Sequence, residues 1–535
     1  MSQGSRAAMV GAEVDAIVVG AGFGGLYQLY KLRELGLKVQ GFEAGADVGG
    51  TWYWNRYPGA RCDIPSLFYS YTWSEDLQRE WRWSEKYAAQ PEILRYANHV
   101  ADRFALRPLI AFETRVLSAT FDEAADRWRV VTDRGDEVSA RWLIMATGCL
   151  STPRAPAIPG IESFAGATYH TGAWPHEGVD FAGKRVAVIG TGSSGIQSIP
   201  EIAAQADHVT VFQRTPNFSI PARNTPLTEQ DIEAFKAMYP QYIAMIKGPG
   251  MGFGGGSAEL PIPDDEAQRK RYEELWAIGG AGFLAAWGNL LTSIEVNDRA
   301  AGFVRDKIGE LVNDRATAEA LSPRDHPLGT KRICVDTGYY ETYNRPNVTL
   351  VNLRTNPIEA IQPHAVRTSE ATYEIDALVF ATGFDAMTGA MLAIDIKGAG
   401  GADFRAAWAE GPKAYLGLAV AGFPNLFLVT GPGSPSVLSN MINSIEQHVE
   451  WISDCIAYMR EKGLTRIAAD PDTQEAWVDH VRQVADKTLF PRAASWYMGA
   501  NIPGKPRVFM PYIGAGYRQK CSDVASAGYE GFELA

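Results

Sequence analysis

Two glycine-rich loops constrain the fold of this chain more than any other feature of its sequence. Residues 20–25 read GAGFGG and residues 190–195 read GTGSSG, and each loop follows a short apolar run that predicts a buried strand. Glycines at this spacing allow a tight turn whose backbone N–H groups approach a pyrophosphate at the positive end of a helix. The sequence therefore predicts an α/β fold with two Rossmann-like dinucleotide-binding domains.

The residues around each loop extend this prediction to a strand–helix–strand unit. The predicted strands span residues 15–19, 37–43, 185–189 and 208–212, and the predicted helices span residues 26–35 and a segment that begins near residue 194. Two such units in one polypeptide indicate two dinucleotide cofactors.

In each unit, the residue that ends the second strand indicates which cofactor the unit binds. In the first unit this residue is Glu43, whose carboxylate suits the ribose hydroxyls of FAD or NAD but repels a 2′-phosphate. The N-terminal position of this unit favours FAD. The corresponding strand of the second unit ends at Arg214 and Thr215, whose guanidinium and hydroxyl groups suit the 2′-phosphate of NADPH. A solvated Arg214 at a loop tip is the alternative interpretation.

Two further apolar strands, ending at residues 148 and 383 in the letters ATG, predict where the chain passes between domains. Helices predicted over residues 228–246, 263–277 and 300–312 form an insertion, with a flexible connection or lid at residues 248–256. A further helix is expected at residues 444–462, with Ser444 and Gln447 as a capping box.

The predicted domains are residues 1–150 (first part of the FAD domain), 151–223 (first part of the NADPH domain), 224–330 (helical insertion), 331–384 (second part of the NADPH domain) and 385–535 (second part of the FAD domain, with the substrate pocket and a mobile loop).

Length, composition and charge limit the class of protein. At 535 residues, with 46% hydrophobic and 21% charged residues, the chain predicts two or three globular domains. A formal net charge of −12 argues against nucleic acid or an anionic membrane as a partner. The N-terminal residues lack an apolar segment typical of a secretory signal. Residues 415–429, the most apolar stretch, are interrupted by glycines and a proline, so they predict buried strands and not a membrane span.

Cysteine and histidine usage adds two expectations. Five cysteines without a CxxC pair indicate reduced thiols and a cytoplasmic location. Eight histidines offer no metal-ligand spacing, so no metal site is expected. The oligomeric state cannot be read from the sequence, which is compatible with a monomer.

Two longer motifs connect this framework to a known family. Residues 164–175 follow F-x-G-x-x-x-H-x-x-x-W-P through Phe164, Gly166, His170, Trp174 and Pro175. Residues 49–63 follow G-G-x-W-x4-Y-P-G-x3-D at every fixed position. With these motifs the chain resembles type I Baeyer–Villiger monooxygenases over essentially its whole length. The resemblance is greatest to the phenylacetone and steroid monooxygenase branch, in residues 56–63, 329–332, 431–441 and 495–510.

The resemblance implies an enzyme that uses NADPH and O2 to convert ketones, here bulky aryl, cyclic or steroidal ones, into esters or lactones. In that family NADPH reduces FAD, and O2 then adds to give a C4a-peroxyflavin that must stay an anion to attack the ketone. The resemblance places the essential arginine at Arg332, paired with Asp63, and Lys331 near the NADPH phosphate. A fixed guanidinium would stabilise negative charge in a dry site, whereas a surface Lys331-Arg332 pair is the alternative.

The resemblance also implies the cofactor and substrate contacts. The residues expected at FAD are Gly20, Gly22, Gly24, Gly25, Glu43, Thr51, Trp52, Tyr53, Trp54, Asp63, Tyr69, Val116 and Met441. The residues expected at NADPH are Arg61, Cys62, Asp63, Thr191, Gly192, Ser193, Ser194, Gly195, Ile196, Gln197, Arg214, Thr215, Lys331, Arg332 and Trp496. The residues expected in the substrate pocket are Ser436, Val437 and Leu438, and residues 491–504 are expected to fold over NADP⁺. We expect His170 to organise an interdomain linker and domain closure, and not to transfer protons.

Other classes of protein share parts of this pattern. A flavin-containing N- or S-oxygenating monooxygenase has both nucleotide folds, but it leaves Asp63 and Arg332 without an obvious task. A disulfide reductase is disfavoured because no CxxC pair is present. A redox-sensing module that only binds NADPH leaves the same pair and the inserted helices unexplained. NADPH oxidation without product is expected as a side activity when substrate is absent.

Overall fold

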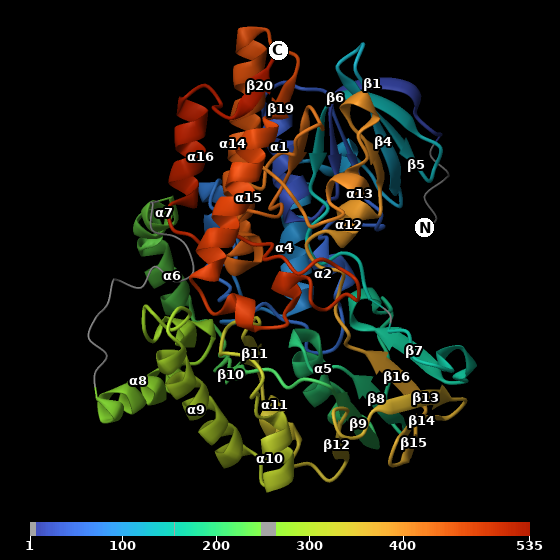
Figure 1. The fold of residues 1–535 in the computed structure, drawn as a ribbon, viewed down its shortest axis with the longest axis vertical. Helices are drawn as coiled ribbons and strands as arrows, with labels where there is room; N and C mark the ends of the chain where they lie inside the picture. The colour runs from blue at the N-terminus through green and yellow to red at the C-terminus, as the bar shows by residue number, and fades with distance from the viewer. Residues whose placement is uncertain (1–6, 155, 248–263) are drawn as a thin grey trace.

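The computed structural model describes residues 7–154, 156–247 and 264–535, and it contains two large β-sheets (Figure 1). The first sheet lies in the upper half of Figure 1 with α14–α16, and the second lies in the lower half beside the insertion helices. The predicted lid at residues 248–256 lies outside the described residues.

The first sheet is built around β1, a strand whose inner residues are fully buried. Its strands in spatial order are β17 (Asp395–Lys397), β4 (Val116–Asp122), β5 (Arg127–Thr132), β6 (Glu137–Met145), β1 (Val10–Val19), β2 (Val39–Phe42) and β3 (Ile110–Ala111), with β18 (Leu426–Leu428) paired to β6. The strands β1, β2, β3 and β18 run parallel to their partners, whereas β4, β5 and β6 form antiparallel pairs. Helix α1 (Phe23–Glu34) packs between this sheet and α14 (Met441–Lys462), which buries both of its faces.

The second sheet is entirely parallel. Its strands in spatial order are β12 (Val348–Asn352), β9 (His208–Gln213), β8 (Arg185–Ile189), β16 (Ala377–Phe380) and β7 (Ala167–His170). The near-continuous apolar sequence of β8 and β16 suits parallel strands that are covered on both faces, one of them by α5 (Ser193–Ala203). The smaller sheets are β10 (Ser219–Pro221) with β11 (Cys334–Asp336), β13 (Ile358–Gln362) with β14 (Ala365–Thr368) and β15 (Thr372–Glu374), and β19 (Ile467–Ala469) with β20 (Phe532–Leu534).

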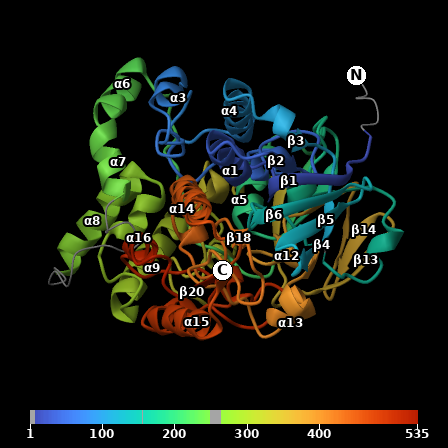
Figure 2. The same ribbon diagram turned by 90° about the horizontal axis from the view of Figure 1, so that it is seen from above.

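The remaining α-helices lie either outside or inside the insertion. Those outside it are α2 (Thr51–Trp54), α3 (Glu75–Glu80), α4 (Gln90–Arg103), α11 (Tyr339–Thr342), α12 (Gly389–Leu392), α13 (Phe404–Ala407), α15 (Pro471–Asp486) and α16 (Tyr517–Ser526). The insertion helices are α6 (Glu229–Ala237), α7 (Tyr239–Lys247), α8 (Asp265–Ile278), α9 (Ile294–Leu311) and α10 (Arg315–Leu321). Seen from above, α6–α8 lie on the side of the molecule opposite to β4, β5 and β13–β14 (Figure 2).

Several expectations about these elements were wrong. The single helix predicted over residues 228–246 is two helices, because Pro240 has no N–H to continue the hydrogen bonding of α6. Helix α14 begins at Met441 with Asn440 as its N-cap, so Ser444 lies inside the first turns and forms no capping box. Within residues 415–429, which predicted buried strands, the structure has a strand only at β18.

The fingerprint segment packs on the second sheet. Residues 167–170 form β7, an edge strand of that sheet. The chain passes between the two sheets before β7 and again after β16, and there Pro153 bridges Phe384 in antiparallel fashion. Within the described ranges, no helix has the length and apolar character needed to cross a membrane.

Candidate active site

A cavity of about 1080 Å³ opens between the two sheets, and both glycine loops line it. The predicted residues that line it are Gly20, Gly22, Gly24, Glu43, Thr51, Trp52, Trp54, Arg61, Cys62, Asp63, Tyr69, Val116, Thr191, Gly192, Ser193, Ser194, Gln197, Arg214, Thr215, Lys331, Arg332, Val437, Met441 and Trp496. Residues predicted for two different cofactors and for substrate therefore share one cavity.

Each glycine loop is shaped by close approaches that only glycine allows. A Cβ atom on Gly25 would lie 1.9 Å from the carbonyl oxygen of Gly20, and one on Gly195 would lie 2.3 Å from that of Gly190. Gly20 and Gly190 themselves have φ values of +105° and +110°, which residues with a side chain rarely adopt. The loops can therefore turn tightly into α1 and α5 and present the helix N-termini to a pyrophosphate in the cavity.

Glu43 closes the first nucleotide loop from the end of β2. Its Oε2 accepts from the backbone N–H of Ala21 at 2.7 Å, and its Oε1 accepts from Gly45 at 2.7 Å. Burial raises the pKa of this carboxyl, while the two backbone donors oppose the shift. The carboxylate faces the cavity with further lone pairs, so it fits ribose hydroxyl groups and not a 2′-phosphate.

The second nucleotide loop ends beside basic groups. Thr191 Oγ1 donates to the carbonyl oxygen of Thr215 at 3.1 Å, which ties the loop to the residue after Arg214. Lys331 comes from the segment before β11, and the charge of Arg214 contributes to lowering its pKa, so the two cations lie near each other. A guanidinium and an ammonium group at this end of the cavity fit a phosphorylated ribose.

Arg332 and Asp63 form an ion pair in the centre of the site, 269 positions apart in the chain. Nε and Nη2 of Arg332 donate to the two carboxylate oxygens of Asp63 at 2.6 and 2.9 Å, and Nη1 donates to the carbonyl oxygen of Val437 at 2.6 Å. Burial by itself raises the pKa of Asp63, but the charge and hydrogen bonds of Arg332 outweigh it and lower that pKa. Asp63 in turn holds the pKa of Arg332 well above its ordinary value despite burial. The pair therefore places a permanent, oriented cation at the cavity wall.

Some predicted residues do not line this cavity. They are Gly25, Tyr53, Gly195, Ile196, Ser436, Leu438, Phe164, Gly166, His170 and Trp174. Gly25 and Gly195 shape the loops from behind, and the Tyr53 hydroxyl turns away to accept from the backbone N–H of Ala46 at 3.1 Å.

Three others, Ile196, Ser436 and Leu438, are held by packing. Ile196 is fully buried in the core between α5 and the second sheet. Ser436 and Leu438 are also buried, and Leu438 packs with Phe490 and Met510 in an apolar cluster behind the cavity wall. Of the three predicted pocket residues, Val437 alone reaches the cavity.

His170 uses both ring nitrogens in structural hydrogen bonds. Nδ1 accepts from the backbone N–H of Gly172 at 2.9 Å, and Nε2 lies 3.1 Å from the carbonyl oxygen of Arg154. Burial lowers the pKa of His170, and the bond to Arg154 opposes the shift. The imidazole therefore bridges β7 and the segment that enters it, and its role in domain closure stays a prediction.

The structure brings further residues to the cavity that the sequence did not indicate. These are, among others, Cys149, Arg154, Asn217 and Leu353. Cys149 directly follows the first ATG sequence, and this position is the one sequence feature that could have indicated its place in the cavity. Gln197 was expected at NADPH, but it also joins the two halves of the site by accepting from the Tyr57 hydroxyl at 2.8 Å and donating to the carbonyl oxygen of Arg61 at 3.0 Å.

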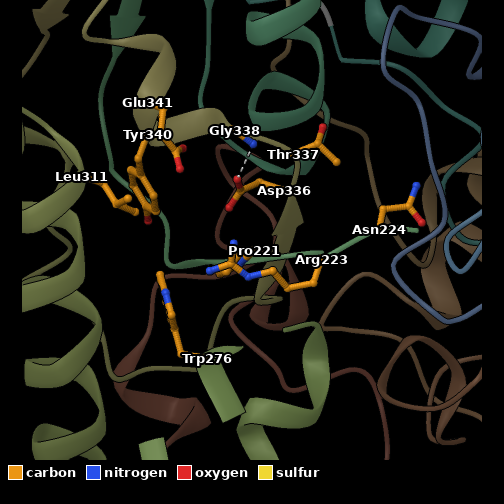
Figure 3. A pocket seen from close by; sticks show the side chains of 10 residues that line it. All are labelled: Pro221, Arg223, Asn224, Trp276, Leu311, Asp336, Thr337, Gly338, Tyr340 and Glu341. Carbon is orange, nitrogen blue, oxygen red and sulfur yellow. Dashed lines mark hydrogen bonds between the residues drawn. The ribbon is translucent and has the colours of Figure 1, made fainter. Parts of the chain in front are cut away.

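A second, smaller cavity of about 220 Å³ lies beside β11, and Asp336 and Arg223 both line it (Figure 3). Ser219 donates its hydroxyl to Asp336 at 2.5 Å, and the backbone N–H groups of Gly338 and Tyr339 donate at 3.0 Å each. Asp336 therefore orders the turn into α11. Among the residues that the structure describes, no group of three or more His, Cys, Asp or Glu side chains could hold a metal ion.

Two dinucleotide loops that face one cavity, with a partly buried Arg–Asp pair between them, define an oxidoreductase of the flavoprotein class that binds two dinucleotides. Comparison with known proteins agrees with this class and narrows it. The family of pyridine nucleotide-disulphide oxidoreductases matches residues 17–247.

Individual relatives match nearly the whole chain. A Baeyer–Villiger monooxygenase of Pseudooceanicola batsensis is 44% identical over 97% of this chain and 96% of the relative. A phenazine N-monooxygenase of Lysobacter antibioticus is 41% identical over 97% of both chains. The structure of oxidized steroid monooxygenase bound to NADP has 50% sequence identity and a TM-score of 0.92, with 98% of this chain and 99% of that chain covered. This chain belongs to the type I Baeyer–Villiger monooxygenase family, and it is a flavin-dependent monooxygenase that uses FAD and NADPH.

Proposed function

We propose that this enzyme converts bulky aryl, cyclic or steroidal ketones into esters or lactones, with Arg332 and Asp63 at the reacting centre. The observation that carries this proposal is the bidentate Arg332–Asp63 pair on the wall of the shared cavity. The 50% identity to a steroid monooxygenase supports a bulky substrate.

We infer that the cavity residues from the first unit hold FAD and that those from the second unit hold NADPH. Trp52 and Tyr69 brace the first site, because the indole N–H of Trp52 donates to the Tyr69 hydroxyl at 3.0 Å. When bound, the flavin supplies the electrons and the oxygen-activating ring, and NADPH supplies the hydride. The protein contributes orientation, a fixed charge and the exclusion of water.

Arg332 carries the chemical part of that contribution. Its guanidinium stabilises the negative charge that develops on oxygen during insertion next to the carbonyl carbon. Asp63 and the Val437 carbonyl fix the guanidinium, so little reorganisation is needed when charge develops. The apolar cluster that includes Val437, Leu438 and Trp496 keeps this wall dry, which strengthens the electrostatic interaction.

The test is a substrate panel with the FAD-loaded enzyme, NADPH and O2. Phenylacetone, cyclohexanone, a steroid with a side-chain ketone and the nitrogen heteroaromatic phenazine would be compared by NADPH consumption and mass spectrometry. Ketone-dependent ester or lactone formation supports the proposal. An N-oxide from phenazine with no ester from any ketone would favour the alternative that the phenazine N-monooxygenase relative suggests.

A further inference from the structure

A cationic side chain outside the predicted site, Arg354, lies next to the proposed 2′-phosphate end of NADPH. The strands β9 and β12 run parallel, with Gln213 in register with Asn352. The backbone N–H of Leu353 donates to the carbonyl oxygen of Gln213 at 2.8 Å, so the pairing continues to the last residue before Arg214. Neighbouring strands are about 4.8 Å apart, which places the residues after each strand side by side.

Asp325 fixes the direction of the Arg354 side chain. Nη2 of Arg354 donates to Oδ2 of Asp325, and Oδ1 of Asp325 lies 2.7 Å from Nδ1 of His326. His326 is buried, and burial together with the charge of Lys331 lowers its pKa to about 4 against the effect of Asp325. The imidazole is therefore neutral at physiological pH and donates to Asp325, which keeps its full negative charge.

Lys331 shows that these groups form one electrostatic cluster. Burial lowers the pKa of Lys331, Asp325 opposes the shift, and Arg214 and Arg354 add to it. Lys331 and Arg354 thus act on the Asp325 carboxylate, and Arg214, from a third chain segment, acts on Lys331. Lys331 and Arg214 line the cavity, and Leu353, next to Arg354, lines it too.

We propose that Arg354, oriented by Asp325, is a further residue that discriminates the 2′-phosphorylated cofactor from its unphosphorylated form. This inference rests on the proposed NADPH site. Three cations and one carboxylate leave an excess of positive charge, which matches a phosphate monoester that carries between one and two negative charges at neutral pH. A guanidinium has five N–H donors, so Arg354 can bind the phosphate while it stays bonded to Asp325.

The proposal is tested by calorimetric titration of the full-length, FAD-loaded enzyme with two nucleotide fragments. Adenosine 2′,5′-bisphosphate carries the 2′-phosphate, whereas 5′-AMP lacks it. We expect Arg354→Gln to weaken binding of the bisphosphate about tenfold, or about 1.4 kcal/mol, and to leave 5′-AMP binding unchanged. Arg354→Lys, which keeps the charge, should retain most of the preference for the bisphosphate.

Arg367→Gln is the matched control. Arg367 is 47% exposed and paired with Glu359 on β13, much as Arg354 is 44% exposed and paired with Asp325. Three results would overturn the inference: an unchanged bisphosphate affinity in Arg354→Gln, an equal loss of affinity for both fragments, or the same loss in Arg367→Gln. None of them would contradict the proposed conversion of ketones into esters. A wild-type enzyme that binds both fragments equally would overturn the inference together with the proposed NADPH site, whatever products it forms.

Discussion

Replacing Arg332 with alanine should separate cofactor reduction from oxygen insertion. The substitution removes the guanidinium that is bonded to Asp63 and to the Val437 carbonyl. We expect the variant to keep FAD and to be reduced by NADPH, because Glu43 and the first glycine loop are untouched. Ester formation should fall about 10²–10³-fold, the loss typical when one preorganised donor is removed from a developing oxyanion.

Anaerobic stopped-flow reduction and product analysis measure these two steps separately. Arg332→Lys keeps the charge but loses the bidentate geometry, so its ester formation should lie between the wild type and Arg332→Ala. Ester formation by Arg332→Ala within tenfold of the wild type would refute the role of the guanidinium. Loss of FAD from the variant would instead show that Arg332 is needed to keep the FAD site intact.

The same substitution has a predictable effect on stability. Breaking a buried pair costs about 3–5 kcal/mol, and we expect about 3 kcal/mol here because the Asp63 side chain is 23% exposed. In the wild type, Arg332 lowers the pKa of Asp63, so the pair stabilises the fold above the unfolded-state pKa and loses this effect as the pH falls through the folded-state pKa. In Arg332→Ala, burial alone raises the pKa of Asp63, and its charged form is costly at neutral pH.

The stability deficit of the variant should therefore be largest at neutral pH and should shrink toward pH 4 as Asp63 becomes protonated. Thermal unfolding midpoints of both proteins across this pH range give the comparison. A deficit that stays constant with pH would contradict the ion-pair explanation.

Three further substitutions test the loops and the fingerprint. Gly25→Ala should abolish flavin binding, seen as loss of flavin absorbance after desalting, because its Cβ would lie 1.9 Å from a backbone oxygen. Gly195→Ala should keep the flavin but weaken NADPH binding at least tenfold in a fluorescence titration, since the contact is 2.3 Å. His170→Phe should lower turnover about tenfold by removing two positioning hydrogen bonds, while the pH profile of kcat keeps its shape. Disappearance of an ionisation from that profile would show that His170 transfers a proton.

Local sequence patterns were sufficient to predict the two nucleotide units. The strand β8 begins and ends at the predicted residues, and β9 differs by one residue at its end. A buried parallel strand, a tight glycine turn and the helix after it are specified by neighbouring residues, so a short window of sequence contains the information. The insertion was less predictable, because a proline divides one apolar helical stretch into α6 and α7.

The start of α14 shows why local patterns fail elsewhere. Ser444 and Gln447 satisfy the pattern of a capping box as well as Asn440 satisfies that of a single cap. The choice depends on where the preceding turn leaves the chain. Asn440 also donates its side-chain amide to the carbonyl oxygen of Phe68 at 2.7 Å, a contact with a distant segment.

The sequence by itself determined the two nucleotide loops, the acidic and basic strand ends, and, through resemblance, the family. Tertiary structure decided which side chains reach the shared cavity. It buries Ser436 and Leu438 behind the wall, leaves Val437 in it, and adds Leu353 beside Arg214. The physical reason is that loop geometry follows from adjacent residues, whereas the direction of a side chain depends on what packs against it from remote parts of the chain.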